Sequence, residues 1–463
     1  MRVNKLVILL VPWLLSSFLA LWPTLSYLIA WAGSFLIFYL TLSGRILELP
    51  KDLKVSQQLM RPIFLTHIIF AGYMSCTSIF YFIGVLGYVN FESPPPFFAV
   101  DQQELESVAK CQRLYCLAHA SFVCGILLVM NYPRPKKNIL AIKDEATFFL
   151  VFALITLPLS TAFLVIPGLR QFYFQFNSLS FIAGTLALAY AIPLKKIGNT
   201  VLCSFLYISN FTQSLLSGYK EPIIISVIVL GVFLYPFYKK TIFLTFIPIL
   251  IALFIILPAY NQVFRSKAWG GEESAQEASD AAIDAVLNSE SEDSAVWGFL
   301  TGRLSEIHMF IKYVDTTPFP IDYYGFDLIE QSLVVIIPRA FWPAKPITEE
   351  MVMERVYNAG VVSRGSHVSA KPPLVVDGYL SGGTLGVFIT LLVYGLIAQL
   401  ISMKAEDLFG GYTLGTALIY SGLFQILWRG LSFEFIINSV FWSYFSMLII
   451  FWILKMLNII KSV

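Results

Sequence analysis

Long, continuously apolar runs alternate with short polar connections along most of this chain. Each run approaches the roughly 20 apolar residues that an α-helix needs to cross a bilayer. Because apolar residues follow one another instead of alternating with polar ones, the runs do not indicate strands of a membrane β-barrel. The pattern predicts about twelve membrane spans near residues 5–22, 24–43, 63–89, 112–131, 146–167, 177–194, 199–216, 221–238, 241–260, 378–402, 411–429 and 435–455.

One long block interrupts this pattern. From Asn261 to Val376 the chain is mixed in charge and holds no run long enough to cross a membrane. We therefore expect an all-α polytopic membrane protein in three parts. Residues 1–260 hold nine spans, residues 261–377 form a large loop, and residues 378–463 hold the last three spans.

The loop has its own pattern. Residues 272–293 are acidic and rich in Ala and Ser, which predicts a solvated helix or a mobile loop without a catalytic role. Residues 296–314 place apolar side chains at helical spacing, which predicts an amphipathic helix at the membrane surface. Residues 333–337 are apolar but too short to span, so they predict an interfacial or re-entrant piece.

Composition supports a membrane protein. Apolar residues make up 57% of the chain and charged residues only 13%. A net charge of +2 gives no reason to expect nucleic acid as a partner. The five cysteines lie in or beside apolar segments without the paired spacing of a zinc site, so we interpret them as small buried hydrophobic residues.

Basic residues indicate the orientation of the spans. Lys and Arg are concentrated in the short connections that lie inside if the N-terminus is inside, and few occupy the opposite ones. An even number of spans then places both termini in the cytoplasm and the 261–376 block outside, together with the loop at Pro94, Pro95 and Pro96. Topology does not explain the many cations of the outside block, which suggests an anionic ligand.

Two candidate anion sites come first along the chain. Lys220 lies in the turn Ser217–Pro222, at the start of a predicted span whose N-terminus favours an anion. A lysine that simply reaches to the membrane interface explains the same pattern. Arg303, Glu306 and His308 lie on the predicted amphipathic helix, where Arg303 and Glu306 are spaced as a surface ion pair.

Two further clusters follow. Arg339 and Lys345 lie in the proline-stiffened, aromatic segment Pro338–Pro346, which also suits an interfacial anchor. The segment from Arg355 to Tyr379 adds basic and acidic candidates: Arg355, Arg364, His367, Lys371 and Asp377. Asp377 stands where a span begins and is equally suited to capping that helix. Arg429 and Glu434 flank a short outside turn and are able to pair with each other.

These stretches carry a resemblance to a known family. The string Pro338–Pro346, followed by Asp377-Gly378-Tyr379, Gly382-Gly383 and Gly386-Val387, resembles the Wzy-like O-antigen and oligosaccharide repeat-unit polymerases. The Ser-Gly-x-basic turn at Ser217 to Lys220 is similar to the corresponding turn in these polymerases and in O-antigen ligases. The family commonly has Arg where Lys220 stands and Glu where Asp377 stands.

The resemblance implies a GT-C-like membrane glycosyltransferase of the bacterial inner membrane. It would join oligosaccharide units carried on undecaprenyl pyrophosphate at the periplasmic face, without a cofactor, with membrane lipid and a chain-length regulator as further partners. Cations would stabilise the departing pyrophosphate, for which the candidates are Lys220, Arg303, Arg339, Lys345, Arg355, Arg364 and Arg429. A base would assist the attacking sugar hydroxyl, for which the candidates are His367, Glu306, Asp377 and His308. No cluster of carboxylates suggests a metal, so we expect metal-independent activity.

Three other functions remain open. An O-antigen-type ligase would use the same lipid-linked donor with a different acceptor. A flippase for lipid-linked sugars, or another transporter, would need charged residues along a path through the bilayer, and the predicted spans carry charge almost only at their ends. A membrane scaffold without enzymatic activity is the last alternative.

Overall fold

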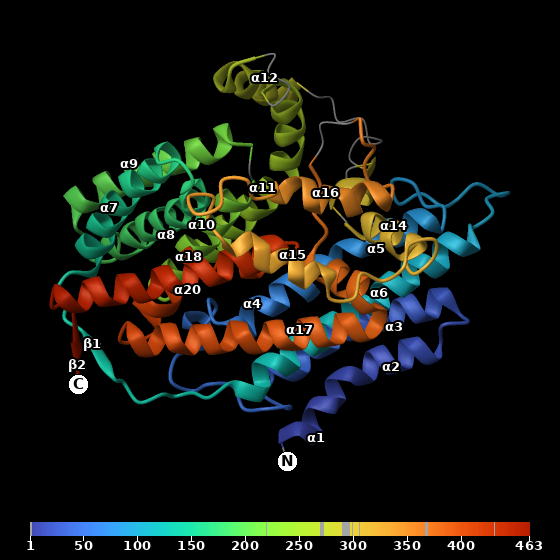
Figure 1. Cartoon of the computed structure of the whole chain (residues 1–463), viewed down its shortest axis with the longest axis horizontal. Helices are drawn as coiled ribbons and strands as arrows, with labels where there is room; N and C mark the ends of the chain where they lie inside the picture. Colours follow the sequence, from blue (N-terminus) through green and yellow to red (C-terminus); the bar gives the residue numbers. More distant parts are fainter. Residues whose placement is uncertain are drawn as a thin grey trace.

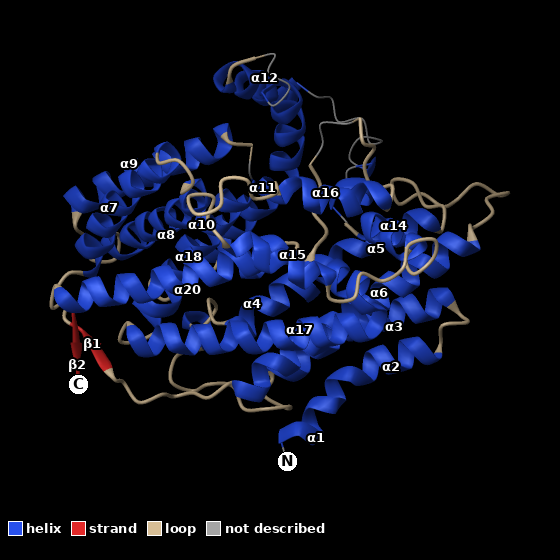
Figure 2. Ribbon diagram, viewed as in Figure 1, coloured by secondary structure: helices blue, strands red, loops and turns tan. Residues whose placement is uncertain are grey.

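The computed structural model describes residues 2–218, 220–268, 273–288, 297–298, 300–304, 306–365, 369–429 and 431–463. In these residues the regular structure is helical apart from one pair of three-residue strands, as Figure 2 shows. The all-α prediction is therefore confirmed.

All twelve apolar segments fold as helices. The first five correspond to α1 to α2 with the 3₁₀ turn η1 between them (Arg2–Leu6, Val7–Leu10, Val11–Phe18), α3 (Pro23–Leu42), α4 to α5 through the π-helical segment η3 (Pro62–Ile69, Phe70–Ser75, Cys76–Val85), α6 (Gln102–Val129) and α7 (Glu145–Val165). The next four are α8 (Tyr173–Ala191), α9 (Ile197–Leu216), α10 (Lys220–Leu234) and α11 (Lys239–Ala268). The last three are α17 (Leu374–Leu408), η6 to α19 (Thr413–Tyr420, Ser421–Leu423, Ile426–Arg429) and α20 (Phe433–Met456).

Six of these helical stretches are long and apolar enough to cross a membrane, counted over the described residues. They are α3, α4 to α5, α6, α7, α17 and α20. Shorter apolar helices run from Asn4 to Phe18, from Pro222 to Leu234 and from Thr413 to Leu423. The chain thus has the helices of a membrane protein, while the total of twelve spans stays a prediction.

α6 lies at the centre of the bundle, and α17 packs along it. In the most apolar 18-residue window of α6, 83% of the residues are buried inside the protein, more than in any other candidate span. Two glycines allow α6 and α17 to approach closely. A Cβ at Gly125 would lie 2.1 Å from the carbonyl oxygen of Leu392, and one at Gly395 would lie 2.2 Å from that of Phe122.

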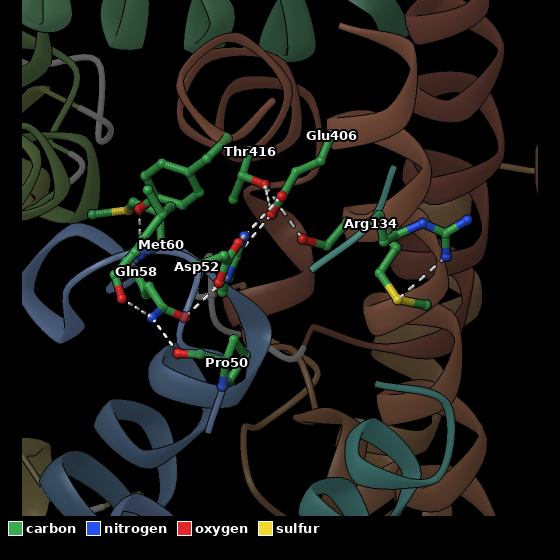
Figure 3. A network of polar contacts seen from close by, with 12 residues as sticks. Pro50, Asp52, Gln58, Met60, Arg134, Glu406 and Thr416 are labelled. Carbon is green, nitrogen blue, oxygen red and sulfur yellow. Dashed lines mark hydrogen bonds and ion pairs between the residues drawn. The ribbon is translucent and has the colours of Figure 1, made fainter. Parts of the chain in front are cut away.

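The two ends of the bundle hold different segments. At one end, which we call the inner end, strand β1 (Asn138–Leu140) pairs antiparallel with β2 (Ile460–Ser462) near the C-terminus, as Figure 1 shows. Arg61, just before α4, binds Asp52 and Glu406 there. Figure 3 shows this inner network. All of these segments were predicted to lie on the cytoplasmic side.

The opposite end, which we call the outer end, holds the 261–377 block. Ser107 Oγ, near the start of α6, donates to Asp315 Oδ1 at 2.7 Å. Tyr379 Oη, near the start of α17, donates to the carbonyl oxygen of Thr317 at 2.8 Å. Segments that the sequence assigned to one side of the membrane therefore contact one another, as that topology requires.

The block itself is helical and packed. α12 (Ala275–Asn288) stands at the top of Figure 1 and buries Ala278 and Ala282 against Tyr260 and Phe264 of α11. The predicted surface helix becomes the π-helical segment η5 (Leu300–Leu304) and α14 (Ile307–Thr316). The apolar face of α14 differs from the prediction, because it packs on α6 through Phe310 and Tyr115 instead of facing lipid.

The short apolar piece of the block becomes part of α15 (Asp327–Ile336), which packs along α20. Its C-terminal carbonyl at Ile336 accepts a 2.7 Å hydrogen bond from Trp442 Nε1, nine residues after the first residue of α20. At about 1.5 Å per residue, this contact lies roughly 13 Å along α20 from its outer end. α16 (Thr348–Asn358) follows α15.

We predict that Gly395→Leu lowers the melting temperature of the purified protein in detergent. The new side chain would meet the Phe122 backbone, and overpacking of this kind typically costs about 1–3 kcal/mol. Gly198→Leu, near the start of α9, is the matched control because nothing lies within 4 Å of its Cβ position. Equal melting temperatures for the two variants would show that α6 and α17 do not pack through Gly395.

Candidate functional site

At the outer end, polar side chains from η3, α5, α6, α14 and α17 gather beneath the loop block. We call this set the outer cluster and define it by Tyr73, Tyr81, Lys110, Arg113, Glu306, His308 and Tyr379. α14 runs antiparallel to α6, since Asp315 contacts Ser107 whereas Phe310 contacts Tyr115, further along α6. The start of α14 therefore points towards the middle of the bundle and carries Glu306 there.

Glu306 is half-buried at the deep edge of the outer cluster. Its Oε1 lies 3.5 Å from Tyr73 Oη. Tyr73 belongs to η3, the π-helical turn between α4 and α5. Wide turns of this kind often occur at functional sites because they turn a side chain out of the regular helical position. Glu306 is thus the predicted base candidate placed deepest in this cluster.

His308 lies two residues after Glu306, in the first turn of α14. Its ring stacks on Tyr81 with 6.1 Å between ring centroids, and Tyr81 Oη donates to Glu104 Oε1 at 2.6 Å. His308 and Glu306 are therefore brought into one region, as two of the four predicted bases.

Two cations of α6 complete the outer cluster. Lys110 Nζ donates to Tyr379 Oη at 3.1 Å, and Arg113 Nη1 donates to Ser26 Oγ at 2.8 Å. Both side chains are half-buried, and no ion pair joins either of them to a carboxylate in the described part of the chain. Cations that are partly withdrawn from water without a carboxylate partner favour an anionic ligand.

Neither residue was predicted from the sequence as a site candidate. Lys110 lies just before the span predicted at 112–131 and Arg113 at its start, whereas the structure extends α6 back to Gln102 and places both on it. Their spacing of three residues on one helix was the available signal.

Asp377 and Arg355, by contrast, belong to a buried ion-pair network. Arg355 of α16 donates from Nε and Nη2 to Asp377 at 3.0 and 2.9 Å, and from Nη1 and Nη2 to Glu434 at 2.8 Å each. Burial alone lowers the pKa of Arg355, but the two carboxylates outweigh it and raise that pKa. Arg355 is thus engaged with protein carboxylates and is a weaker candidate for binding pyrophosphate.

Asp377 also caps a helix, although not the one that contains it. It lies inside the first turn of α17, and its Oδ2 accepts a 2.9 Å hydrogen bond from the backbone N–H of Phe433 at the start of α20. Glu434 pairs with Arg355. The Arg355, Asp377 and Glu434 side chains therefore join α16, α17 and α20.

The segment Pro338–Pro346 is held by its own cations. Lys345 is buried and donates from Nζ to the carbonyl oxygens of Val335 at 3.0 Å and Ile337 at 2.6 Å. Burial, and then the charge of Arg339, lower the pKa of Lys345. Lys345 therefore caps the end of α15, while Arg339 remains at the surface and donates to the carbonyl oxygens of Pro343 at 3.3 Å and Pro346 at 2.9 Å.

Arg364 lies apart from these groups. It is exposed and binds Glu354 with two hydrogen bonds of 2.9 and 2.6 Å, and this carboxylate raises its pKa. The structure therefore does not bring Arg364 into the outer cluster.

Four predicted site residues cannot be placed in this geometry. His367 lies outside the described residues, as do the side chains of Lys220, Arg303 and Arg429. Their helices are described: Lys220 begins α10, Arg303 lies in η5 and Arg429 ends α19. Within the described ranges, no group of three or more His, Cys, Asp or Glu side chains could hold a metal ion, and metal-independent activity stays a prediction.

We predict that Arg355→Leu destabilises the protein far more than Arg364→Leu. The first change leaves two buried carboxylates without their partner, and loss of one member of a buried pair typically costs about 3–5 kcal/mol. The second removes an exposed pair from the same loop, for which about 0–1 kcal/mol is typical. The measurement is thermal unfolding in detergent, and equal effects would contradict the role assigned to Arg355.

Comparison with known proteins gives a family but no function. No curated protein and no solved structure matches the chain. One family model, described as "Domain of unknown function (DUF8712)", matches residues 11–462. Since this match covers nearly the whole sequence, the chain belongs to the DUF8712 family.

Proposed function

We propose that this protein is a membrane glycosyltransferase that polymerises oligosaccharide units carried on undecaprenyl pyrophosphate. The observation that carries the proposal is the outer cluster, in which Lys110 and Arg113 lack carboxylate partners in the described chain and Glu306 lies beside Tyr73. A lipid-linked pyrophosphate is an anion that arrives at this depth, at the boundary between lipid and water. The resemblance to Wzy-like polymerases supplies the reaction.

In this reaction the hydroxyl oxygen of one unit attacks the anomeric carbon of another. A new glycosidic C–O bond forms as the bond to the pyrophosphate oxygen breaks, and undecaprenyl pyrophosphate leaves with the electron pair. Lys110 and Arg113 would stabilise the charge that develops on the leaving group. Glu306 would accept the hydroxyl proton, with Tyr73 orienting its carboxylate.

The proposal includes a membrane topology. All twelve helical segments cross the inner membrane in a GT-C-like arrangement, both termini are cytoplasmic, and the outer cluster faces the periplasm. The contacts between β1 and β2, and between Ser107 and Asp315, support it because each joins segments assigned to one side.

The first test asks which product fails to form. In a deletion strain we expect single repeat units to accumulate on undecaprenyl pyrophosphate, with longer chains restored by the intact gene. If the strain instead accumulates complete polymer on the lipid carrier, the protein acts as a ligase and the polymerase proposal is wrong.

Replacement of the two α6 cations tests the site itself. We expect Lys110→Met and Arg113→Met each to reduce polymer formation about a hundredfold, the usual effect of removing one preorganised donor to developing negative charge. Lys312→Met is the matched control, since Lys312 is exposed on the neighbouring α14. Polymer yield is compared at equal protein levels in membranes, and near-normal yield from both α6 variants would exclude them from the site.

Topology is tested with single cysteines in a chain whose five native cysteines are replaced. We expect Asp322→Cys, in the exposed connection between α14 and α15, to react with an impermeant thiol reagent in intact spheroplasts. Lys51→Cys, exposed at the inner end, should react only after the membrane is opened. The reverse labelling would invert the proposed orientation.

A further inference from the structure

α7 carries a shallow apolar groove on its exposed side. The groove has a volume of about 440 Å³ and is lined by Leu157, Pro158, Thr161, Ala162 and Val165, which follow one side of the helix over about two turns. Pro158 lies inside the helix, where its missing N–H interrupts the regular hydrogen bonding. Because α7 is a candidate membrane span, this groove faces the region that lipid chains occupy.

Two arginines stand where the groove reaches the outer end of α7. The chain turns at Gly168 and continues to Arg170, which is exposed. Gly168 has φ +80° and touches the 338–346 segment, since a Cβ there would lie 2.4 Å from the backbone nitrogen of Ala340. Arg339 is the neighbour of Ala340. Arg170 and Arg339 therefore lie close in sequence to the two residues, Gly168 and Ala340, whose backbones touch at the end of the apolar groove.

The backbone that carries Arg339 is fixed. The Arg339 guanidinium donates hydrogen bonds to two carbonyl oxygens of the 338–346 segment. Lys345, in the same segment, donates to two carbonyl oxygens at the end of α15. Trp442 binds the carbonyl of Ile336 and packs against Phe172, next to α8, with 5.1 Å between ring centroids. A segment held in this way loses little freedom when it binds a ligand.

We propose that the α7 groove and these two arginines form a binding site for a second lipid-linked unit. The prenyl chain lies along Leu157 to Val165, and the pyrophosphate meets Arg339 and Arg170. A pyrophosphate diester carries two negative charges, which suits two arginines better than the single charge of a phospholipid diester.

This assignment rests on the proposed function, because polymerisation uses two lipid-linked units and the outer cluster accounts for one. α15 joins the two regions. The segment before it meets α17 where Tyr324 N–H donates to the carbonyl oxygen of Leu380 at 2.9 Å, next to Tyr379. Its far end leads into Arg339, about 15 Å away along a ten-residue helix.

Binding of undecaprenyl pyrophosphate to the purified full-length protein in detergent tests the site. We expect Ala162→Trp, which fills the groove, and Arg339→Ala, which removes the charge, each to weaken binding about tenfold in native mass spectrometry. Val201→Trp on the exposed side of α9 is the matched control and should leave binding unchanged. Phosphatidylglycerol should fail to compete.

Two results would overturn the site: equal competition by phosphatidylglycerol, or unchanged binding in both the Ala162→Trp and Arg339→Ala proteins. The proposed function is tested separately, by measuring the polymer that the wild-type protein forms. If the wild type binds the lipid at this site but forms no polymer, the site stands and the proposed function fails. If the wild type forms polymer while Ala162→Trp binds normally, the site fails alone.

Discussion

A buried arginine between two carboxylates stands at each end of α17. At the outer end Arg355 binds Asp377 and Glu434, and at the inner end Arg61 binds Asp52 and Glu406. Asp377 and Glu406 are 29 residues apart (406 − 377), on either side of the kink at Gly382 and Gly383 that divides α17. Such pairs add little net stability, but a misplaced partner leaves a buried charge uncompensated, so they favour one arrangement of the helices around α17.

The cations of the outer end fall into two groups, according to the protein groups that they bind. Arg355 holds α16 to α17 and α20, and Lys345 holds the end of α15, so neither has its charge directed towards solvent. Lys110, Arg113 and Arg339 bond to hydroxyls or carbonyls, which leave a positive charge uncancelled. The residues with carboxylate partners build the scaffold, and those without them are suited to an anion.

The helical segments could be predicted from the sequence because each is specified by its own apolar residues. The short apolar piece at 333–337 was likewise predicted to be too short to span, and all but its last residue lies in α15 beside α20. The partners of Arg355 could not be identified in this way. They lie 22 and 79 residues away, and only the packing of α16 on α17 and α20 brings them together. Asp377 illustrates the same limit, since local pattern suggested a cap for α17 and the structure uses it for α20.

The middle of the bundle shows why Tyr73 faces Glu306. The wide turn of η3 is supported by polar side chains within the membrane region: Trp31 Nε1 donates to the carbonyl oxygen of Ser75 at 2.8 Å, and Ser78 Oγ donates to Gln112 Oε1 at 2.9 Å. One turn before η3, the His67 and His119 rings are joined by a 2.9 Å hydrogen bond between α4 and α6. Buried polar groups are costly in a membrane unless they are paired. Paired as they are here, they fix η3 against α3 and α6, and the position of Tyr73 opposite Glu306 follows from that packing.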